Sequence, residues 1–165
     1  MVDSHDKIRR SRRGLLVRTY RLLQGAALVL AILLTSPGAA RAETLVIHAG
    51  GSAFKFEVEL ATTPAEREKG LMFRKAMGAN AGMLFLYPGD EPVAFWMKNT
   101  LIPLDMLFLK ADGRIVHIAH DAKPLDETPI PSGEPVRAVL ELNGGTAAAL
   151  GIKEGDRVES AALVP

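Results

Sequence analysis

The chain has 165 residues, of which 20 are Lys or Arg and 19 are Asp or Glu, and it contains no Cys. Disulfide crosslinks and a thiol nucleophile are therefore excluded, and the fold must be stable through packing alone. The length fits one domain with a sizeable core, preceded by a short segment of different composition.

That N-terminal segment, residues 1–42, is typical of a secretory signal peptide. Basic residues precede an apolar run at 22–34, and the small-residue exit Ala40-Arg41-Ala42 follows it. This order predicts cleavage before Glu43. An uncleaved anchor helix is the alternative, but spanning a membrane takes about 20 apolar residues. We therefore expect a periplasmic or secreted protein with no membrane insertion after signal removal.

The export route stays open between the Sec and the twin-arginine pathways. Residues 11–16, Ser-Arg-Arg-Gly-Leu-Leu, are similar to a twin-arginine signal, and Arg41 beside the cleavage site fits that route. Adjacent Arg residues also occur by chance in basic leader segments, and Arg9-Arg10 is a second pair here.

Removal of residues 1–42 changes the charge balance of the protein. Eight of the 20 basic residues and two of the 19 acidic ones lie there, so residues 43–165 keep 12 basic and 17 acidic residues. The formal net charge of this part is −5. An acidic domain without a basic cluster argues against nucleic acid and against an anionic membrane surface as partners.

The mature chain is predicted to begin with a β-hairpin and a short helix. Apolar residues alternate along 52–60, and Gly50-Gly51 suits a two-residue turn. Thr63, Pro64 and Glu66 form the start of a helix that is expected over 64–71 and ends near Gly70.

The rest of the chain predicts strands, one long loop and one more short helix. The continuous run at 82–88 does not alternate between apolar and polar residues, which indicates a central strand buried on both faces. Asp112-Gly113 is a strong signal for a hairpin turn. Four Pro residues indicate a long loop at 121–135. The expected strands are 82–88, 93–98, 104–110, 114–119, 136–142 and one from Gly155, and the helix is 146–150. Together these predict a mostly β (α+β) domain, an antiparallel β sandwich or partly open barrel with one or two short helices.

Residues 95–105 combine polar and apolar side chains in the way that a small binding pocket does. The segment holds the only Trp of the chain, Trp96, together with Lys98, Asn99, Thr100 and Asp105. In strand geometry Trp96, Lys98 and Thr100 would share one face. The alternative is purely structural: Trp96 covers the core edge while Asn99 and Thr100 close a turn.

Several local motifs together resemble the family named domain of unknown function 192. They are Gly-Leu-Met-Phe-Arg at 70–74, Gly-Met-Leu-Phe at 82–85, the segment 95–105, and Val-Leu-Glu-Leu at 139–142 followed by Gly144. The resemblance covers about residues 55–160. It implies a compact, mostly β domain, often exported, and no established activity. The hallmark positions that it implies are Arg74, Trp96, Met97, Asn99, Thr100, Pro103 and Asp105.

Other chemistries have weaker support in the residues. His117 and His120 are three apart on an expected strand and so point to opposite faces, which disfavours a His metal site. Met72, Met83 and Met106 stand among Leu and Phe, as core residues do, which disfavours a copper site. Gly144-Gly145-Thr146 opens a helix and could hold an anion, but no nucleotide-loop Lys accompanies it. No metal, cofactor or catalytic residue is therefore assigned.

Two function hypotheses remain. The first is a non-catalytic exported module that binds a small molecule, a glycan or an envelope protein. Its expected ligand-binding residues are Arg74, Trp96, Met97, Asn99, Thr100 and Asp105. The second is a hydrolase that uses Asp105, with Glu141 as a possible second carboxylate across strands.

Asp105 is expected to be partly desolvated beside apolar neighbours, so its carboxylate needs hydrogen-bond donors. Arg74 or a backbone turn could supply them. A two-residue hairpin turn would place Asp105 opposite His120, Leu107 opposite Ile118 and Leu109 opposite Val116. A three-residue turn would instead place Ala119 opposite Asp105. If its role is structural, Asp105→Asn should cost about 1–3 kcal/mol.

Overall fold

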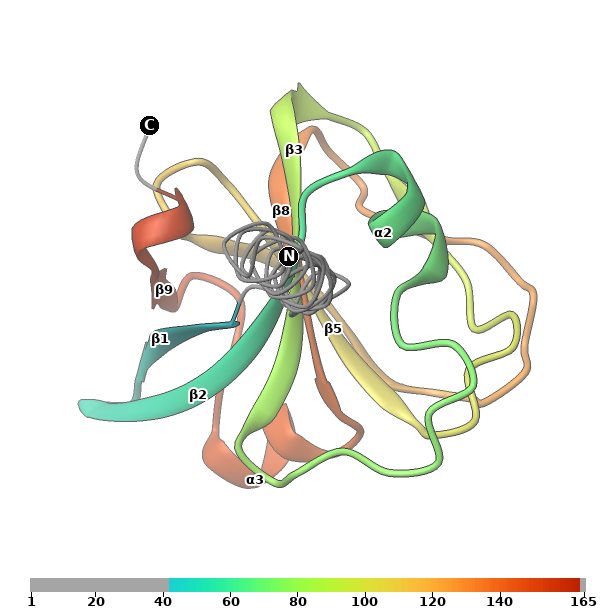
Figure 1. Ribbon diagram of the computed structural model, residues 1–165. Helices are drawn as coiled ribbons and strands as arrows, with labels where there is room; N and C mark the ends of the chain where they lie inside the picture. Colours follow the sequence, from blue (N-terminus) through green and yellow to red (C-terminus); the bar gives the residue numbers. More distant parts are fainter. Residues whose placement is uncertain (1–41, 164–165) are drawn as a thin grey trace, which may run out of the picture. The chain divides into compact units, whose positions relative to one another are not determined.

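A strongly curled seven-stranded sheet, in the strand order β6-β5-β8-β3-β2-β1-β9, is the framework of the protein (Figure 1). The structure is a computed structural model that describes residues 42–163. The expected signal peptide and its twin-arginine motif lie outside these residues, except for Ala42. In the described part, no helix is long and apolar enough to cross a membrane.

The elements alternate short strands with very short helices. Their bounds in chain order are β1 (Ala42–Ala49), β2 (Ser52–Ala61), α2 (Pro64–Lys69), β3 (Ala81–Glu91), β4 (Ala94–Phe95), β5 (Leu104–Leu109), β6 (Ile115–Ala122), β7 (Ile130–Pro131), β8 (Val136–Asn143), α3 (Thr146–Leu150), β9 (Arg157–Glu159) and the 3₁₀ turn η1 (Ala161–Leu163). The small strands β4 and β7 form a separate two-stranded sheet. The mostly β fold class predicted from the sequence is confirmed.

Neighbouring strands of the large sheet are antiparallel, except for the parallel pair β2 and β3. The helix α2 makes the connection between these two strands, as a parallel pair requires a crossover. The predicted β1–β2 hairpin is confirmed. Its turn residues Gly50 and Gly51 have φ angles of +58° and +81°, which residues with a Cβ rarely adopt.

The two ends of the strand order meet at one point, so the sheet is a partly closed barrel. The Val158 N–H donates to the Gly113 carbonyl (2.8 Å), and the Ile115 N–H donates to the Asp156 carbonyl (2.9 Å). A Cβ at Gly113 would lie 2.0 Å from the Val158 carbonyl oxygen. Only glycine therefore permits this approach.

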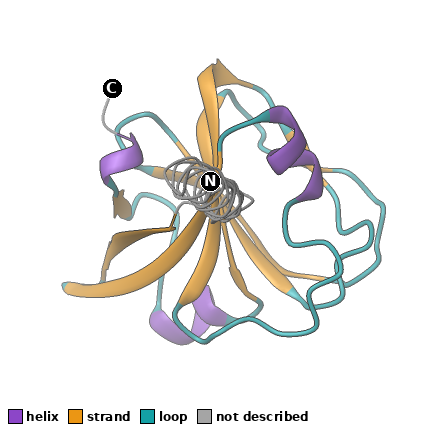
Figure 2. Cartoon of the chain, in the orientation of Figure 1, coloured by secondary structure: helices purple, strands orange, loops and turns teal. Residues whose placement is uncertain are grey.

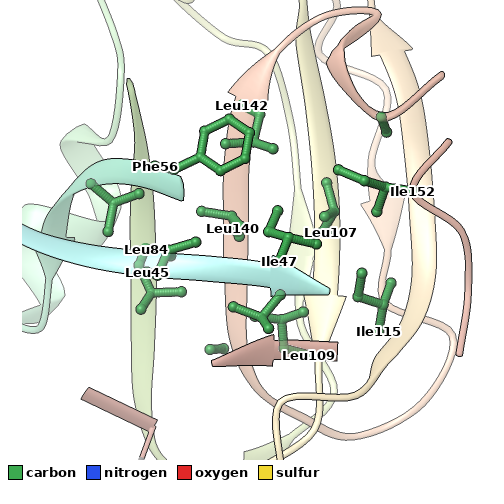
Figure 3. Close-up of a cluster of buried hydrophobic side chains, with 14 of the residues drawn as sticks. Leu45, Ile47, Phe56, Leu84, Leu107, Leu109, Ile115, Leu140, Leu142 and Ile152 are labelled. Carbon is green, nitrogen blue, oxygen red and sulfur yellow. The ribbon is translucent and has the colours of Figure 1, made fainter. Parts of the chain in front are cut away.

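A first apolar cluster, the inner cluster, fills the concave side of the sheet (Figure 3). It includes alternate residues of the long strands, such as Leu107 and Leu109 of β5 and Leu140 and Leu142 of β8. Alternation along a strand places every second side chain on the same face. The intervening residues must therefore lie on the opposite, convex face.

A second apolar cluster, the outer cluster, covers the convex face of β3, β5 and β8. It includes Phe85 of β3, Met106 and Phe108 of β5, and Val139 of β8. Figure 2 shows that α2 and most of the long loops gather on one side of the sheet. Because β5 is buried on both faces, all six of its residues are buried, and all of them except Asp105 are apolar instead of alternating with polar residues.

Several predicted boundaries are wrong. The strand expected at 114–119 continues to Ala122, and the loop expected at 121–135 contains the short strand β7. The strand expected at 93–98 is only Ala94–Phe95, because the chain turns away beyond it, with Asn99 at φ +56°. The central strand does not end at Pro88 but continues to Glu91. Its ladder with β8 is interrupted between Leu86 and Glu91, so the missing N–H of Pro88 is tolerated there.

The predicted capping box of α2 is confirmed. The Glu66 N–H donates to the Thr63 hydroxyl (3.3 Å), and the Thr63 N–H donates to the Glu66 carboxylate (2.8 Å). Donation by the Thr63 and Thr62 backbone N–H groups lowers the pKa of Glu66 to about 2. Gly70, with φ +45°, ends the helix, and this fixes the position of α2 beside the convex face.

Candidate functional site

The segment after β4 forms a tight turn on which two other loops rest. The Thr100 N–H donates to the Met97 carbonyl (3.0 Å), and Asn99 adopts the left-handed conformation that Asn tolerates better than most residues. The Asn99 carbonyl accepts from the Phe73 N–H, and the Thr100 carbonyl accepts from the Leu125 N–H. The turn thus fixes both loops through its own backbone.

Within this segment, only some side chains are accessible. Met97 is fully buried in the outer cluster, whereas Trp96 is 48% exposed. The Lys98 ammonium lies 5.2 Å from the centroid of the Trp96 ring, within the range of a cation–π contact. The expectation that Trp96 belongs to a surface that can meet a ligand is thus compatible with its exposure.

A pocket of about 270 Å³ opens between α2 and β4, on the convex side of the sheet. Its aromatic wall consists of Phe85, Tyr87, Phe95 and Trp96. The rings of Phe85 and Phe95 meet edge to face with centroids 5.0 Å apart. The remaining lining comes from α2 and the residues after it, from Thr100, and from Glu141 of β8.

Glu141 occupies the outward-facing register of β8 inside an otherwise apolar layer. Its neighbours Leu140 and Leu142 belong to the inner cluster, so its side chain points to the convex face. Its partners across the adjacent strands are Met83 and Met106, both members of the outer cluster. The carboxyl group therefore lies below the pocket among thioethers and aromatic rings.

The Glu141 carboxyl has no bonding partner among residues 42–163, although the residue is only 4% exposed. In the same part of the chain, no side-chain oxygen is both sealed from solvent and without a hydrogen bond. The carboxyl must therefore reach solvent through the pocket that it lines. Burial without a donor raises the pKa of Glu141 to about 8.

Charged groups from α2 form the rim of the pocket. The Arg67 guanidinium lies 5.0 Å from the Tyr87 ring centroid and donates to the carbonyls of Thr62 and Leu86. Glu68 and Lys69 complete the rim. Burial raises the pKa of Tyr87 to about 12, so its hydroxyl stays protonated at neutral pH.

A second, more open recess of about 440 Å³ lies beside the first. Glu68, Lys69, Met72 and Trp96 line both of them, and Asn99 lines only the second. The Asn99 amide nitrogen lies 3.9 Å from the Met72 sulfur. Trp96 thus stands between two hollows and presents surface to each.

Asp105 lies on the opposite face of the sheet from Glu141. It is fully buried, and its carboxylate accepts hydrogen bonds from the N–H groups of Asp121 (2.8 Å), Gly145 (3.1 Å) and Ala147 (2.7 Å). The glycine turn at the start of α3 does hold an anion, and that anion is the side chain of Asp105. This position therefore offers no accessible carboxylate to the hydrolase hypothesis.

The comparisons with known proteins agree with the motifs. The DUF192 family, described as "Uncharacterized ACR", matches residues 45–160. The chain belongs to the DUF192 family. No curated protein matches it.

Two solved structures resemble this DUF192 protein over most of their length. One is a Sinorhizobium meliloti protein that is provisionally named a transcription regulator. It is 44% identical to this chain, and the two structures have a TM-score of 0.75. The match covers 77% of this chain and 99% of the Sinorhizobium meliloti chain. A protein of unknown function from Novosphingobium aromaticivorans is also 44% identical, with a TM-score of 0.71; the match covers 76% of this chain and 94% of that one. The fold is therefore shared at close sequence similarity.

Arg74, which was expected to be a possible donor to Asp105, does not reach it. Its guanidinium forms two parallel hydrogen bonds with the Glu59 carboxylate, at 2.5 and 2.6 Å. The side-chain bond to Arg74 lowers the pKa of Glu59. Both side chains are about one third exposed, so the pair ties the loop after α2 to β2 without entering the pocket.

The six expected ligand-binding residues of this DUF192 domain thus divide among several places. Trp96 and Thr100 line the pocket, and Asn99 lines the adjacent recess. Met97 is a core residue, Asp105 holds the start of α3, and Arg74 pairs with Glu59. The predicted Leu107–Ile118 pairing is confirmed, but the predicted Leu109–Val116 pairing is wrong, because the register shifts after Phe108 and Leu109 lies opposite Ile115. A second shift places Asp105 opposite both His120 and Asp121.

The expected set lacked the most unusual side chain of the site, Glu141. The sequence contained one usable signal for it. Residues 136–142 read as a strand with apolar residues in both registers at its centre, and Glu141 is the only acid among them. An acid in a strand that is buried on both faces cannot be an ordinary solvated residue.

Among the described residues, no group of three or more His, Asp or Glu side chains could hold a metal ion.

Proposed function

We propose that this DUF192 protein is an exported, non-catalytic binding domain whose ligand is a small molecule held in the pocket between α2 and β4. The observation that carries the proposal is the Glu141 carboxyl, which is buried, has no partner in the described residues and opens into that pocket. An unpaired buried carboxyl destabilises a fold. A ligand that pairs with it would offset that cost.

The composition of the pocket supports a small ligand over a macromolecule. Small-molecule sites are concave, mostly apolar and contain a few polar groups. This pocket has four aromatic side chains and one polar group at its base, and its volume of about 270 Å³ is near the lower limit of such sites. A glycan chain or an envelope protein would contact mainly the exposed Trp96, whereas a small molecule fits the pocket down to Glu141.

The name of the Sinorhizobium meliloti relative, a transcription regulator, is not carried over to this chain. Residues 43–165 have 17 acidic and 12 basic residues. Binding to DNA depends on neutralising phosphates with clustered Lys and Arg. A net negative domain supports a small-molecule ligand better than a nucleic acid.

A thermal-stability screen of residues 43–165 tests the proposal. A ligand that binds the folded state is expected to raise the melting temperature in proportion to the logarithm of its concentration. Trp96→Ala should remove this shift, because Trp96 forms part of the pocket wall. Leu101→Ala is the matched control, since Leu101 is also an exposed apolar residue (42%) but does not line the pocket.

An equal shift in the Trp96→Ala protein would place the ligand elsewhere and contradict the proposal. So would a shift that is lost in Leu101→Ala and kept in Trp96→Ala. Fluorescence of Trp96, the only Trp of the chain, provides an independent signal in the unmodified protein.

The export part of the proposal rests on the signal-peptide pattern of residues 1–42 and on the position of the sheet. Because β1 begins at Ala42, cleavage before Glu43 would leave the sheet nearly complete. Mass spectrometry of the protein expressed in full in a Gram-negative host should find a periplasmic species that begins at Glu43. A species that keeps residues 1–42 in the membrane fraction would contradict it.

A further inference from the structure

We propose that the ligand is a small organic cation, whose ammonium group pairs with the Glu141 carboxylate and is surrounded by the rings of Phe85, Tyr87 and Phe95. This inference rests on the proposed function and specifies the chemical class of the ligand. It combines two independent features of one pocket, an unpaired carboxyl at the base and an aromatic wall above it.

The aromatic wall is suited to a positive charge. The faces of aromatic rings carry negative electrostatic potential and attract ammonium groups, most strongly where water is excluded. Two cations of the protein already use rings of this wall: Arg67 lies over Tyr87, and the Lys98 ammonium lies over Trp96. A ligand cation deeper in the pocket would find the same chemistry together with a carboxylate.

The base of the pocket favours a cation over an anion or a purely apolar molecule. An apolar ligand would bury the Glu141 carboxyl with no partner and gain nothing for that desolvation. An anion would oppose ionisation of the carboxyl and would find no positive partner at the base of the pocket. A cation forms an ion pair there, and pairs in low-dielectric surroundings are stronger than those at a surface.

The charged and titratable groups around the pocket do not provide this partner. From α2 these are Arg67, Glu68 and Lys69 at the rim, and from β3 the group is Tyr87, whose hydroxyl stays protonated at neutral pH. The Arg67 guanidinium is already bonded to two backbone carbonyls. The cross-strand neighbours of Glu141 on β3 and β5 are the uncharged Met83 and Met106.

Binding of a cation must then release a proton. In the free protein, burial raises the pKa of Glu141 to about 8, so the carboxyl is mostly protonated at pH 7. The bound ammonium stabilises the carboxylate, and the proton of the carboxyl passes to the buffer. Affinity for a permanently charged cation should therefore increase about tenfold between pH 7 and pH 9.

Choline and 3,3-dimethyl-1-butanol are the matched probes, because they have nearly the same shape and only choline is charged. Titration calorimetry and Trp96 fluorescence with residues 43–165 should show choline bound at least about tenfold more tightly than the neutral alcohol. At pH 7, close to one proton should be released for each choline bound. The binding heats measured in phosphate and in Tris should therefore differ by close to the difference between the protonation heats of the two buffers. Choline keeps its charge at every pH used, so a change of affinity with pH reports on the protein.

Glu141→Gln keeps the shape of the side chain and removes its charge. It should reduce choline affinity about tenfold or more and abolish both the proton release and the increase towards pH 9. Glu154→Gln is the control for the loss of one acidic residue, since Glu154 lies in the loop before β9 and does not line the pocket. Its choline affinity should equal that of the unmodified protein.

Three results would overturn the inference: equal affinity for choline and the neutral alcohol, tighter binding at pH 7 than at pH 9, or no choline binding at all. In each case the broader proposal is judged separately by the stability screen. A neutral ligand that stabilises the protein and requires Trp96 would leave the binding function in place and reject the cationic class.

Discussion

Between pH 5 and pH 8, the unmodified protein is expected to lose about 3 kcal/mol more unfolding free energy than the Glu141→Gln protein. The pKa of Glu141 is about 8 in the folded protein, and the ordinary value for the unfolded chain is 4.5. Between these values the folded state binds more protons than the unfolded state. Stability is therefore highest at the acidic end and decreases as the pH rises through 8.

Urea denaturation of both proteins at several pH values measures this effect. The difference between the two curves isolates Glu141, because all other titrating groups are shared. At pH 8 the variant should be the more stable of the two, since an amide can be buried with no cost of ionisation. Parallel curves for the two proteins would show that Glu141 ionises normally and that the pocket does not desolvate it.

Asp105→Asn is expected to lower the unfolding free energy by about 3 kcal/mol and the melting temperature by about 10 °C. Three backbone N–H groups converge on the two carboxylate oxygens of Asp105. The amide of Asn has only one acceptor oxygen, and its NH₂ group would face at least one N–H donor. This leaves a buried donor without a partner, at the first turn of α3 or at the bulge of β6.

Ligand binding separates this structural role from a functional one. Below its melting temperature, Asp105→Asn should bind the pocket ligand as the unmodified protein does, because Asp105 lies on the opposite face of the sheet from Glu141. Asp112→Asn is the matched control, since its carboxylate accepts one local bond from the Arg114 N–H at an exposed turn. An unchanged melting temperature together with lost binding would reverse the assignment of Asp105.

The sequence alone was sufficient to predict the elements that are fixed by interactions between residues close together in the chain. The capping residues Thr63 and Glu66 predict α2, and Gly50-Gly51 predicts the first hairpin. Residues 146–150 predict α3 with the bounds that it has in the structure. In each case the decisive hydrogen bonds or φ angles involve residues within four positions of one another.

The candidate site could be predicted only in part, because its contacts are not local. Trp96 is conspicuous as a single Trp in a polar setting, and it does line the pocket. The partners of Asp105, in contrast, include Gly145 and Ala147, about forty residues further along the chain. Glu141 is exceptional because β3 and β5 enclose β8 on both sides, and the sequence indicates this only through the apolar residues in both registers of 136–142.

The contact of Gly113 with Val158 also affects how molecules of this protein meet one another. The outermost strand of a sheet normally presents unpaired N–H and C=O groups, on which a strand of another molecule can add. Here the backbone at the start of β6 and the backbone around the start of β9 form hydrogen bonds with each other, for example between Ile115 and Asp156. Further along β6, the bulge opposite Asp105 interrupts the regular edge. The sheet therefore offers no long regular edge for strand addition, which protects the protein against aggregation without a disulfide.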